Sequence, residues 1–404
     1  MKDKTYVLPY KSCFVWGALR YFSQIKDSIC LVHGPKGCSF FYKAFLNFVN
    51  KYDGTPPRIY STDFNEHDVI FGGIKKLEDS IIELHNEFQP QLITVLNCCV
   101  SEVIGEDIKG VLYRLQERVN CKLLAVQGAG FKGDHKAGMK EACHIIFDEF
   151  IKPLPQSISK TNSINYIGEL NPNNWSIREL VSILNKFDIE VNTIIPTGCS
   201  IYDFSKIPTA KLNYLICGSA GNILATQISK KFDIPTMGGQ ADFLGLENSK
   251  QTLEKILDFF GINSDIPQTL YDKAHKKVAN LKPAFYGKTA VIIGGTRRAL
   301  GYSRILSELG FVVSLVFSEQ DEIISKEKLQ ELSANVLYDE LPETIYSYIK
   351  SNQPDVVMTT LPELVLPETY LETVQDFFGF SGFCKFALFL QQQLSFNNKI
   401  KVLG

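Results

Sequence analysis

The run Ile29-Cys30-Leu31-Val32-His33 and the segment Gly34-Pro35-Lys36-Gly37-Cys38 that follows it decide how this chain begins to fold. The apolar run is typical of a buried strand, and the glycines and proline after it indicate a turn. A second apolar run, Leu92-Ile93-Thr94-Val95-Leu96, leads to a pair of cysteines, Cys98 and Cys99. Cysteine thiols therefore lie just beyond the ends of two predicted strands.

These thiols are candidate metal ligands. Ligands bind at the carboxyl ends of strands in open α/β sheets, so Cys38 and Cys99 can converge on one point, and Cys13 can supply a third thiol. We expect these three cysteines to hold an iron–sulfur cluster. Cys98 is expected in the core, because neighbours on an extended strand point to opposite faces. A bend at the strand end would instead make Cys98 the third ligand.

The composition argues against several classes of protein. The chain has 404 residues, with 42 Lys and Arg against 44 Asp and Glu, and no run of like charge that would predict nucleic-acid binding. No stretch reaches the roughly 18 apolar residues of a membrane span, and the N-terminus lacks a secretion signal, so we expect a cytoplasmic protein. Ten cysteines without a Cys-x-x-Cys pair favour metal binding over disulfides. Cys30, Cys121 and Cys143 lie in apolar patterns and are expected to be inert core thiols.

Strand-like and helix-like patterns alternate along the chain, which implies right-handed βαβ units and an α/β fold with parallel sheets. The expected strands include 29–33, 92–96, 122–126, 164–168, 191–195, 212–216, 312–316 and 355–358. The expected helices include 108–119, 176–187, 222–232, 249–260 and 299–309. The pattern restarts after two prolines near residue 155 and again near residue 285, so we predict domains 1–155, 156–284 and 285–404.

Taken in order, these landmarks resemble the nitrogenase component 1 superfamily. The likeness rests on the segment 33–38 with Cys13 upstream, on the loop from Cys99 to Asp107, and on the turn Gly130-Phe131-Lys132-Gly133. The superfamily comprises the subunits of the molybdenum–iron protein, their cofactor-assembly paralogues, and nitrogenase-like reductases of tetrapyrroles and organic sulfur compounds.

The resemblance implies three Rossmann-like α/β domains around a central cleft. It also implies that Cys13, Cys38 and Cys99 bind a [4Fe–4S] or P-cluster-like centre at a subunit interface, where a partner supplies a further ligand. The partners would be an ATP-dependent iron-protein reductase and either a second copy, in a homodimer, or a beta-type paralogue, in a heterotetramer.

Two further segments resemble sites of the alpha-type subunits. Residues 215–219 resemble the segment that anchors one end of the large iron–sulfur cofactor, which would make Cys217 a ligand. The loop with Gly294, Gly295 and Arg297 resembles the glycine–arginine loop that approaches this cofactor. Glycine permits close backbone approach, and arginine offers several donors to an anionic cluster. The alternatives are a buried cysteine at a strand end and a glycine turn for a phosphate.

The chain departs from the dinitrogen-reducing alpha subunit at two positions. Met139 stands where that subunit carries a histidine, and no histidine follows His275. The resemblance therefore favours an alpha-type scaffold on which the iron–molybdenum cofactor, or a larger iron–sulfur precursor, is assembled. The close alternative is a nitrogenase-like reductase of Ni-sirohydrochlorin diamide, another tetrapyrrole or a methylthio-alkane. A metal-free α/β binding protein is the third interpretation.

Acidic residues follow Cys99 in the loop 100–107. We expect this loop to expose Glu102, Glu106 and Asp107 as part of a docking face for the reductase, because acidic side chains steer a basic patch on a partner. The alternative is that they stabilise the start of the next helix. In a tetrapyrrole reductase, His135, Glu106 or Asp107 would supply a proton, with helix capping again as the alternative.

Overall fold

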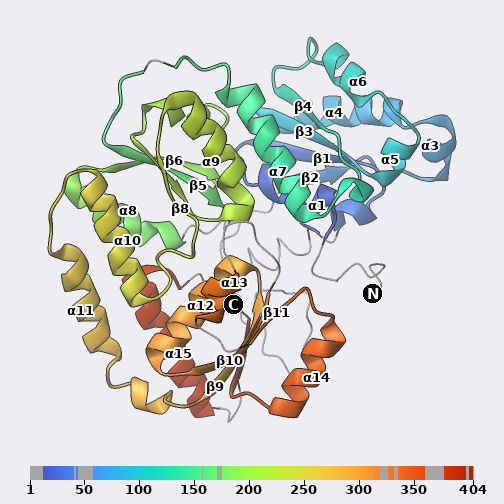
Figure 1. Cartoon of the computed structure of the whole chain (residues 1–404). Coiled ribbons are helices and arrows are strands. Elements are labelled where there is room, and N and C mark those ends of the chain that lie inside the picture. The colour runs from blue at the N-terminus through green and yellow to red at the C-terminus, as the bar shows by residue number, and fades with distance from the viewer. Residues whose placement is uncertain are drawn as a thin grey trace.

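The computed structural model describes residues 12–40, 42–43, 58–156, 158–170, 175–318, 326–331, 335–359, 377–396 and 400–403. Their strands form three separate sheets, all parallel, with helices packed against them (Figure 1). The predicted α/β class is confirmed. None of the helices in this described part combines the length and the apolar character that crossing a membrane requires.

The first sheet has the strand order β2-β1-β3-β4. Its strands are β1 (Ser28–His33), β2 (Ile59–Ser61), β3 (Leu92–Asn97) and β4 (Lys122–Val126). The helices of this part are α1 (Phe14–Phe22), α3 (Glu66–Phe71), α4 (Ile74–Phe88), α5 (Cys99–Val103), α6 (Ile108–Leu115) and α7 (His135–Ile146). Side chains alternate along β1, so that Ile29 and Leu31 pack toward α4 and α6, whereas Cys30 and Val32 pack toward α1 and α7.

The second sheet has the order β6-β5-β7-β8. Its strands are β5 (Ser163–Glu169), β6 (Glu190–Pro196), β7 (Leu212–Leu215) and β8 (Thr236–Gly238). The helices of this part are α8 (Trp175–Leu184), α9 (Gly218–Phe232), α10 (Leu246–Phe259) and α11 (Ile266–Val278). In Figure 1, α10 and α11 run down one side of the molecule toward the third sheet.

The third sheet has the order β11-β10-β9-β12-β13. Its strands are β9 (Thr289–Gly294), β10 (Val312–Ser318), β11 (Val336–Tyr338), β12 (Val356–Thr359) and β13 (Ile400–Leu403). The helices are α12 (Thr296–Leu309), α13 (Lys326–Gln330), α14 (Pro342–Asn352) and α15 (Gly379–Phe396). Although α15 is near the end of the chain, it contacts α8, α10 and α11, which ties the third part to the second.

Two apolar cores connect the three sheets. One lies between the first and second sheets, where α7 packs against α9, and the other lies between the second and third sheets. Each strand falls within the domain range expected for its sheet, while the boundaries after residues 155 and 284 stay predictions. Cys30, Cys121 and Cys143 are buried, as expected.

Most of the expected helices differ by up to three residues at an end, and two differ by four. The helix expected over 108–119 ends at Leu115, because the Gln116 side chain bonds to the Cys121 carbonyl at 2.8 Å and to the Leu123 N–H at 3.0 Å. The helix expected from residue 222 begins already at Gly218. The small residues 218–221 are typical of a turn, but here they form the first turn of α9. They let this helix start close to β5, since a β-carbon on Gly221 would lie 3.0 Å from the backbone of that strand.

Candidate metal centre

Strand register brings the two cysteine loops together. His33, the last residue of β1, is paired with Asn97, the last residue of β3, so the two strands end at the same level. The Cys98 N–H donates to the His33 carbonyl at 3.3 Å and joins the two loops. Cys38 lies in the first helical turn that follows the loop after β1, and Cys99 is the first residue of α5, one residue after the end of β3. The predicted convergence of these strand ends is therefore present.

Cys13 reaches the same edge from α1. It is the N-cap residue of α1 and pairs with Asp134 in an isolated antiparallel bridge. Gly130, in the turn after β4, lies against Cys13 and Cys99. Its N–H donates to the Cys99 sulfur at 3.2 Å, and a β-carbon on it would lie 3.2 Å from both the Cys99 Sγ and the Cys13 Cβ. A side chain at position 130 would crowd both cysteines.

Cys98 lies deeper than the other cysteines of this edge. Its exposed fraction is 1%, whereas Cys13, Cys38 and Cys99 are exposed. Its sulfur is turned toward the loop after β1, because a β-carbon on Gly34 would lie 2.0 Å from the Cys98 Sγ. The Cys38 and Cys98 thiols also share a hydrogen bond. Cys98 is buried, as expected, yet its sulfur is hydrogen-bonded to that of the predicted ligand Cys38.

The thiols influence one another's ionisation. The hydrogen bond between the two thiols lowers the pKa of Cys98 and raises the pKa of Cys38. Burial and the charges of Cys98, Cys13 and Cys99 raise the pKa of Cys38 further. By contrast, burial is the cause that raises the pKa of Cys30. We call Cys13, Cys38, Cys98 and Cys99 the thiol quartet.

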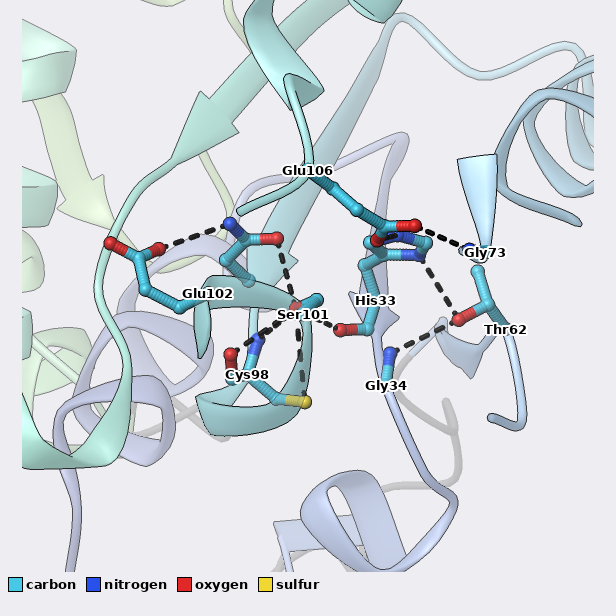
Figure 2. Close-up of polar contacts among 9 residues, drawn as sticks. His33, Gly34, Thr62, Gly73, Cys98, Ser101, Glu102 and Glu106 are labelled. Atoms are coloured by element: carbon cyan, nitrogen blue, oxygen red, sulfur yellow. Dashed lines mark hydrogen bonds and ion pairs between the residues drawn. The ribbon is translucent and has the colours of Figure 1, made fainter. Parts of the chain in front are cut away.

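A buried histidine–glutamate hydrogen bond lies beside the quartet (Figure 2). His33 Nε2 lies 2.7 Å from a Glu106 carboxylate oxygen, and the exposed fractions of these side chains are 0% and 5%. Glu106 also accepts from the Gly73 N–H, and Thr62 Oγ1 lies 3.2 Å from His33 Nδ1 and accepts from the Gly34 N–H at 3.0 Å. In this network a neutral His33 donates from Nε2 to Glu106. Burial lowers the pKa of His33, although the hydrogen bond to Glu106 opposes this effect.

Ser101 connects the His33–Glu106 pair to the quartet (Figure 2). Its hydroxyl donates to the His33 carbonyl at 2.8 Å and accepts from the Cys98 N–H at 3.1 Å. The neighbouring Glu102 accepts from Asn97 at 3.1 Å. The loops after β1 and β3 are thus held by side chains as well as by strand pairing.

The expected exposure of the acidic loop is wrong for Glu106, whose side chain is buried against His33. Glu102 is partly exposed and lies 2.5 Å from Lys132, whose hydrogen bond lowers the pKa of Glu102. Asp107 is exposed and caps α6 by accepting from the Gly110 N–H at 3.0 Å. Asp107 therefore has the capping role that was its alternative.

Two histidine-related expectations concern α7. His135, a candidate proton donor, begins this helix and is 7% exposed, beside the Trp16 ring at a centroid distance of 6.4 Å. Its expected place as a surface helix cap is therefore wrong, because the packing of α1 on α7 covers it. Met139 is buried in the core between the first and second sheets.

Cys217 lies at the corresponding edge of the second sheet. It follows β7, is the N-cap residue of α9 and is partly buried. Its backbone lies close to Gly168 of β5, where an added β-carbon would lie 2.8 Å from the Cys217 carbonyl oxygen. This position matches the predicted strand end.

The glycine–arginine loop lies at the carboxyl edge of the third sheet. Gly294 ends β9, and Gly295 is the N-cap residue of α12 with open space where a β-carbon would be. Arg297 lies in the first turn of α12. Burial raises the pKa of Tyr214, a residue of β7, and the positive charge of Arg297 opposes that rise. The approach of Cys217 to Arg297 stays a prediction.

The donor set at the first-sheet edge fits an iron–sulfur cluster. Thiolates are the soft ligands that such clusters use, and each iron takes its own sulfur ligand, so thiols spread around one edge suit a cluster. Gly34 and Gly130 keep side chains away from these sulfurs. Within the described residues, no three His, Cys, Asp or Glu side chains are arranged to hold a single metal ion. Fold and site together define a thiol-bearing protein of parallel α/β sheets.

The family follows from comparison with known proteins. Residues 13–379 match the family described as nitrogenase component 1 type oxidoreductase, and the chain belongs to this family. Membership implies iron–sulfur cluster binding, an iron-protein reductase partner and a beta-type paralogue.

Individual relatives agree with this assignment. The nitrogenase iron-molybdenum cofactor biosynthesis protein NifE of Methanococcus maripaludis is 27% identical over 401 residues, covering 94% of this chain and 82% of that protein. The nitrogenase molybdenum-iron protein alpha chain of Methanosarcina barkeri is 27% identical over 368 residues, covering 85% and 66%. The solved structure of nitrogenase Cp1 at pH 5 has the same fold, with a TM-score of 0.81 at 21% identity, covering 97% and 90%.

Proposed function

We propose that this chain is an alpha-type component 1 subunit that serves as a scaffold in the assembly of the iron–molybdenum cofactor. The observation that carries the proposal is the gathering of the exposed thiols of Cys13, Cys38 and Cys99 at one sheet edge. The similarity to the NifE protein of Methanococcus maripaludis, which extends over 94% of the chain, supports the scaffold role.

In this proposal Cys13, Cys38 and Cys99 hold a [4Fe–4S] or P-cluster-like centre. Such a cluster supplies one-electron redox chemistry when bound. The chain's own contribution is to orient the ligands: the Gly130 N–H donates to the Cys99 sulfur, and Ser101 holds the start of α5, where Cys99 lies.

A larger iron–sulfur precursor would be held by Cys217, with Gly294, Gly295 and Arg297 around it. Arg297 offers charge-assisted hydrogen bonds to an anionic group, and the open space at Gly295 leaves room for that group. No histidine follows His275, which suits a scaffold, since a site with fewer protein ligands releases its cargo more readily.

The partner surfaces would lie at the thiol quartet. Phe40, Val103 and Phe131 flank the three cysteine loops and are 63%, 75% and 61% exposed, which supports a subunit interface there. The partner is a beta-type paralogue in a heterotetramer or a second copy in a homodimer. Glu102 and Asp107 remain as the partly or fully exposed acids of a reductase-docking face.

Iron analysis of variants tests the cluster. Protein purified without oxygen should contain iron and sulfide, with visible absorbance that dithionite bleaches. Cys13→Ala, Cys38→Ala and Cys99→Ala should each lose this absorbance, whereas Cys121→Ala, at a buried cysteine directly before β4, should keep it. Iron content that none of the three changes affects would overturn the proposal.

A nitrogenase-like reductase of a tetrapyrrole or of an organic sulfur compound is the second candidate, and the missing histidine after His275 favours it equally. Loading by the cell's own assembly machinery separates the two functions. For a scaffold, Cys217→Ala should lower the iron content to that of the cluster at the quartet. Equal iron content in wild type and Cys217→Ala would favour the reductase.

A further inference from the structure

The thiol quartet contains one more cysteine than the three predicted ligands. Cys98 and Cys99 are neighbours in sequence, but their sulfurs face different loops of the same edge. The Cys99 sulfur accepts from Gly130 in the loop after β4, and the Cys98 sulfur lies against Gly34 in the loop after β1. The alternation of a strand has already ended here, because Cys98 is an N-cap residue and Cys99 is in a helix.

The surroundings of Cys98 differ from those of an ordinary core cysteine. Its sulfur occupies the space that a side chain at position 34 would need, with 2.0 Å to a β-carbon there. It also shares a hydrogen bond with Cys38, a predicted ligand, and lies 3.9 Å from the Ser101 hydroxyl. Cys30, which is also buried, lies inside β1 and packs in the apolar core.

We propose that Cys98 is a fourth cluster ligand, so that this chain holds a [4Fe–4S] cluster with four thiolates of its own. The inference rests on the proposed cluster at this edge and goes beyond it, since three cysteines would leave one iron to a ligand from a partner. On binding, the hydrogen bond between Cys38 and Cys98 is replaced by two sulfur–iron bonds. Each thiol that binds releases its proton to solvent, with no change in the oxidation state of sulfur.

The proposal makes the cluster independent of the partner subunit. A [4Fe–4S] cluster with four cysteine ligands resists iron loss on mild oxidation better than one in which an iron lacks a thiolate ligand, because that iron is the first to leave. The chain should therefore carry a complete cluster when it is produced alone. A site completed by a paralogue should carry one only in the assembled complex.

The experiment uses the full chain, produced without a paralogue and purified without oxygen. Wild type, Cys98→Ala and Cys98→Ser are compared, with Cys30→Ala as the control for removing a buried sulfur from the same sheet. Iron and sulfide per chain are measured before and after mild oxidation with ferricyanide, together with the electron paramagnetic resonance spectrum. Thermal unfolding confirms that each variant is folded, and Cys98→Ser keeps the side-chain size if Cys98→Ala does not fold.

Wild type and Cys30→Ala should hold about four irons per chain through oxidation, whereas Cys98→Ala should fall to about three and give the spectrum of a [3Fe–4S] cluster. Cys98→Ser should lose iron on oxidation or change the spectrum of the reduced cluster. Full iron content with an unchanged spectrum in Cys98→Ala and Cys98→Ser would show that Cys98 only hydrogen-bonds to Cys38. A wild-type chain that gains its fourth iron only with a paralogue also overturns the proposal. These two outcomes do not contradict the proposed function. A wild-type chain without iron, alone or in complex, would contradict both the proposed function and the fourth ligand.

Discussion

The carboxyl edges of the first and second sheets share one local arrangement but differ in the hydrogen bonding of their cysteine sulfurs. At each edge a buried strand leads to a cysteine that is the N-cap residue of the next helix, Cys98 before α5 and Cys217 before α9. At the first edge the sulfurs bond to their surroundings: Cys99 accepts from Gly130, and Cys98 shares a hydrogen bond with Cys38. At the second edge the Cys217 side chain caps none of the helix N–H groups.

This difference indicates two kinds of site. The first edge is fixed by hydrogen bonds between loops that are distant in sequence, such as His33 with Glu106 and Gly130 with Cys99. A preorganised edge suits a resident group, because little rearrangement is needed to bind it. At the edge of the third sheet, Gly295 faces open space, which suits a group that enters and leaves.

The largest expected effect separates the two edges by their iron content. Cys99→Ala should lower the iron content of the first edge, because a metal–thiolate bond is lost. Cys217→Ala should leave that cluster intact, because the two sites share no ligand. Iron and sulfide analysis of both variants, prepared side by side, measures this. Loss of the first cluster in Cys217→Ala would show that the edges are one site, and the comparison would fail.

The next effect concerns the stability of the first edge. Glu106→Ala should lower the free energy of unfolding by about 3 kcal/mol, because it leaves a buried histidine and a backbone N–H without their acceptor. Glu102→Ala is the control on the same loop. Its pair with Lys132 is partly exposed, with side-chain exposures of 21% and 40%, so its loss should cost under about 1 kcal/mol.

Urea unfolding of both variants measures the difference. Equal costs for Glu106→Ala and Glu102→Ala would mean that the buried His33–Glu106 pair does not hold this edge. A large cost for both would point to a cooperative loop in which every acid matters.

The first edge also shows which features the sequence predicts and which it does not. The apolar runs 29–33 and 92–96 predict β1 and β3, because buried parallel strands are apolar on both faces, and the cysteines at their ends predict the site. Nothing local marks Glu106 as buried. Its partner His33 is 73 residues away, and only the assembled sheet brings the two side chains together.

The same limit applies to Cys98. The period of a strand predicts that its sulfur points away from that of Cys99, and the burial is confirmed. The start of α5 at Cys99 turns the backbone at this point, so the alternation no longer tells which loop the sulfur meets. The one usable signal was the glycine at position 34, directly after β1, which leaves space for a sulfur from the neighbouring loop.

A third prediction tests that space. Gly34→Ala should destabilise the chain by about 1–3 kcal/mol, because its β-carbon would lie 2.0 Å from the Cys98 Sγ and force the loops apart. Gly295→Ala is the matched control at the other edge. It adds the same methyl group to open space at a φ of −61°, so its effect should stay within about 0.5 kcal/mol.

Thermal and urea unfolding of the two alanine variants decide the matter. A destabilised Gly295→Ala would show that the third-sheet edge is as tightly packed as the first, and the contrast between resident and open sites would be lost. An unaffected Gly34→Ala would mean that the Cys98 sulfur moves easily away from the loop after β1.

The smallest expected effect is a pH dependence that only the first edge should have. Burial holds the pKa of His33 below its ordinary value of 6.5, so the folded chain keeps this side chain neutral where the unfolded chain takes up a proton. Acidification from about pH 7.5 through the ordinary histidine pKa therefore favours the unfolded chain, and the free energy of unfolding falls.

His33→Gln should be less stable than wild type at neutral pH, because it weakens the network with Glu106, but it should show a flatter decline between about pH 7.5 and 5.5. His67→Gln, at an exposed histidine of α3, is the control and should follow the wild-type curve. Melting temperatures across this pH range test the prediction, and an equally steep decline in His33→Gln would place the acid sensitivity in another part of the molecule.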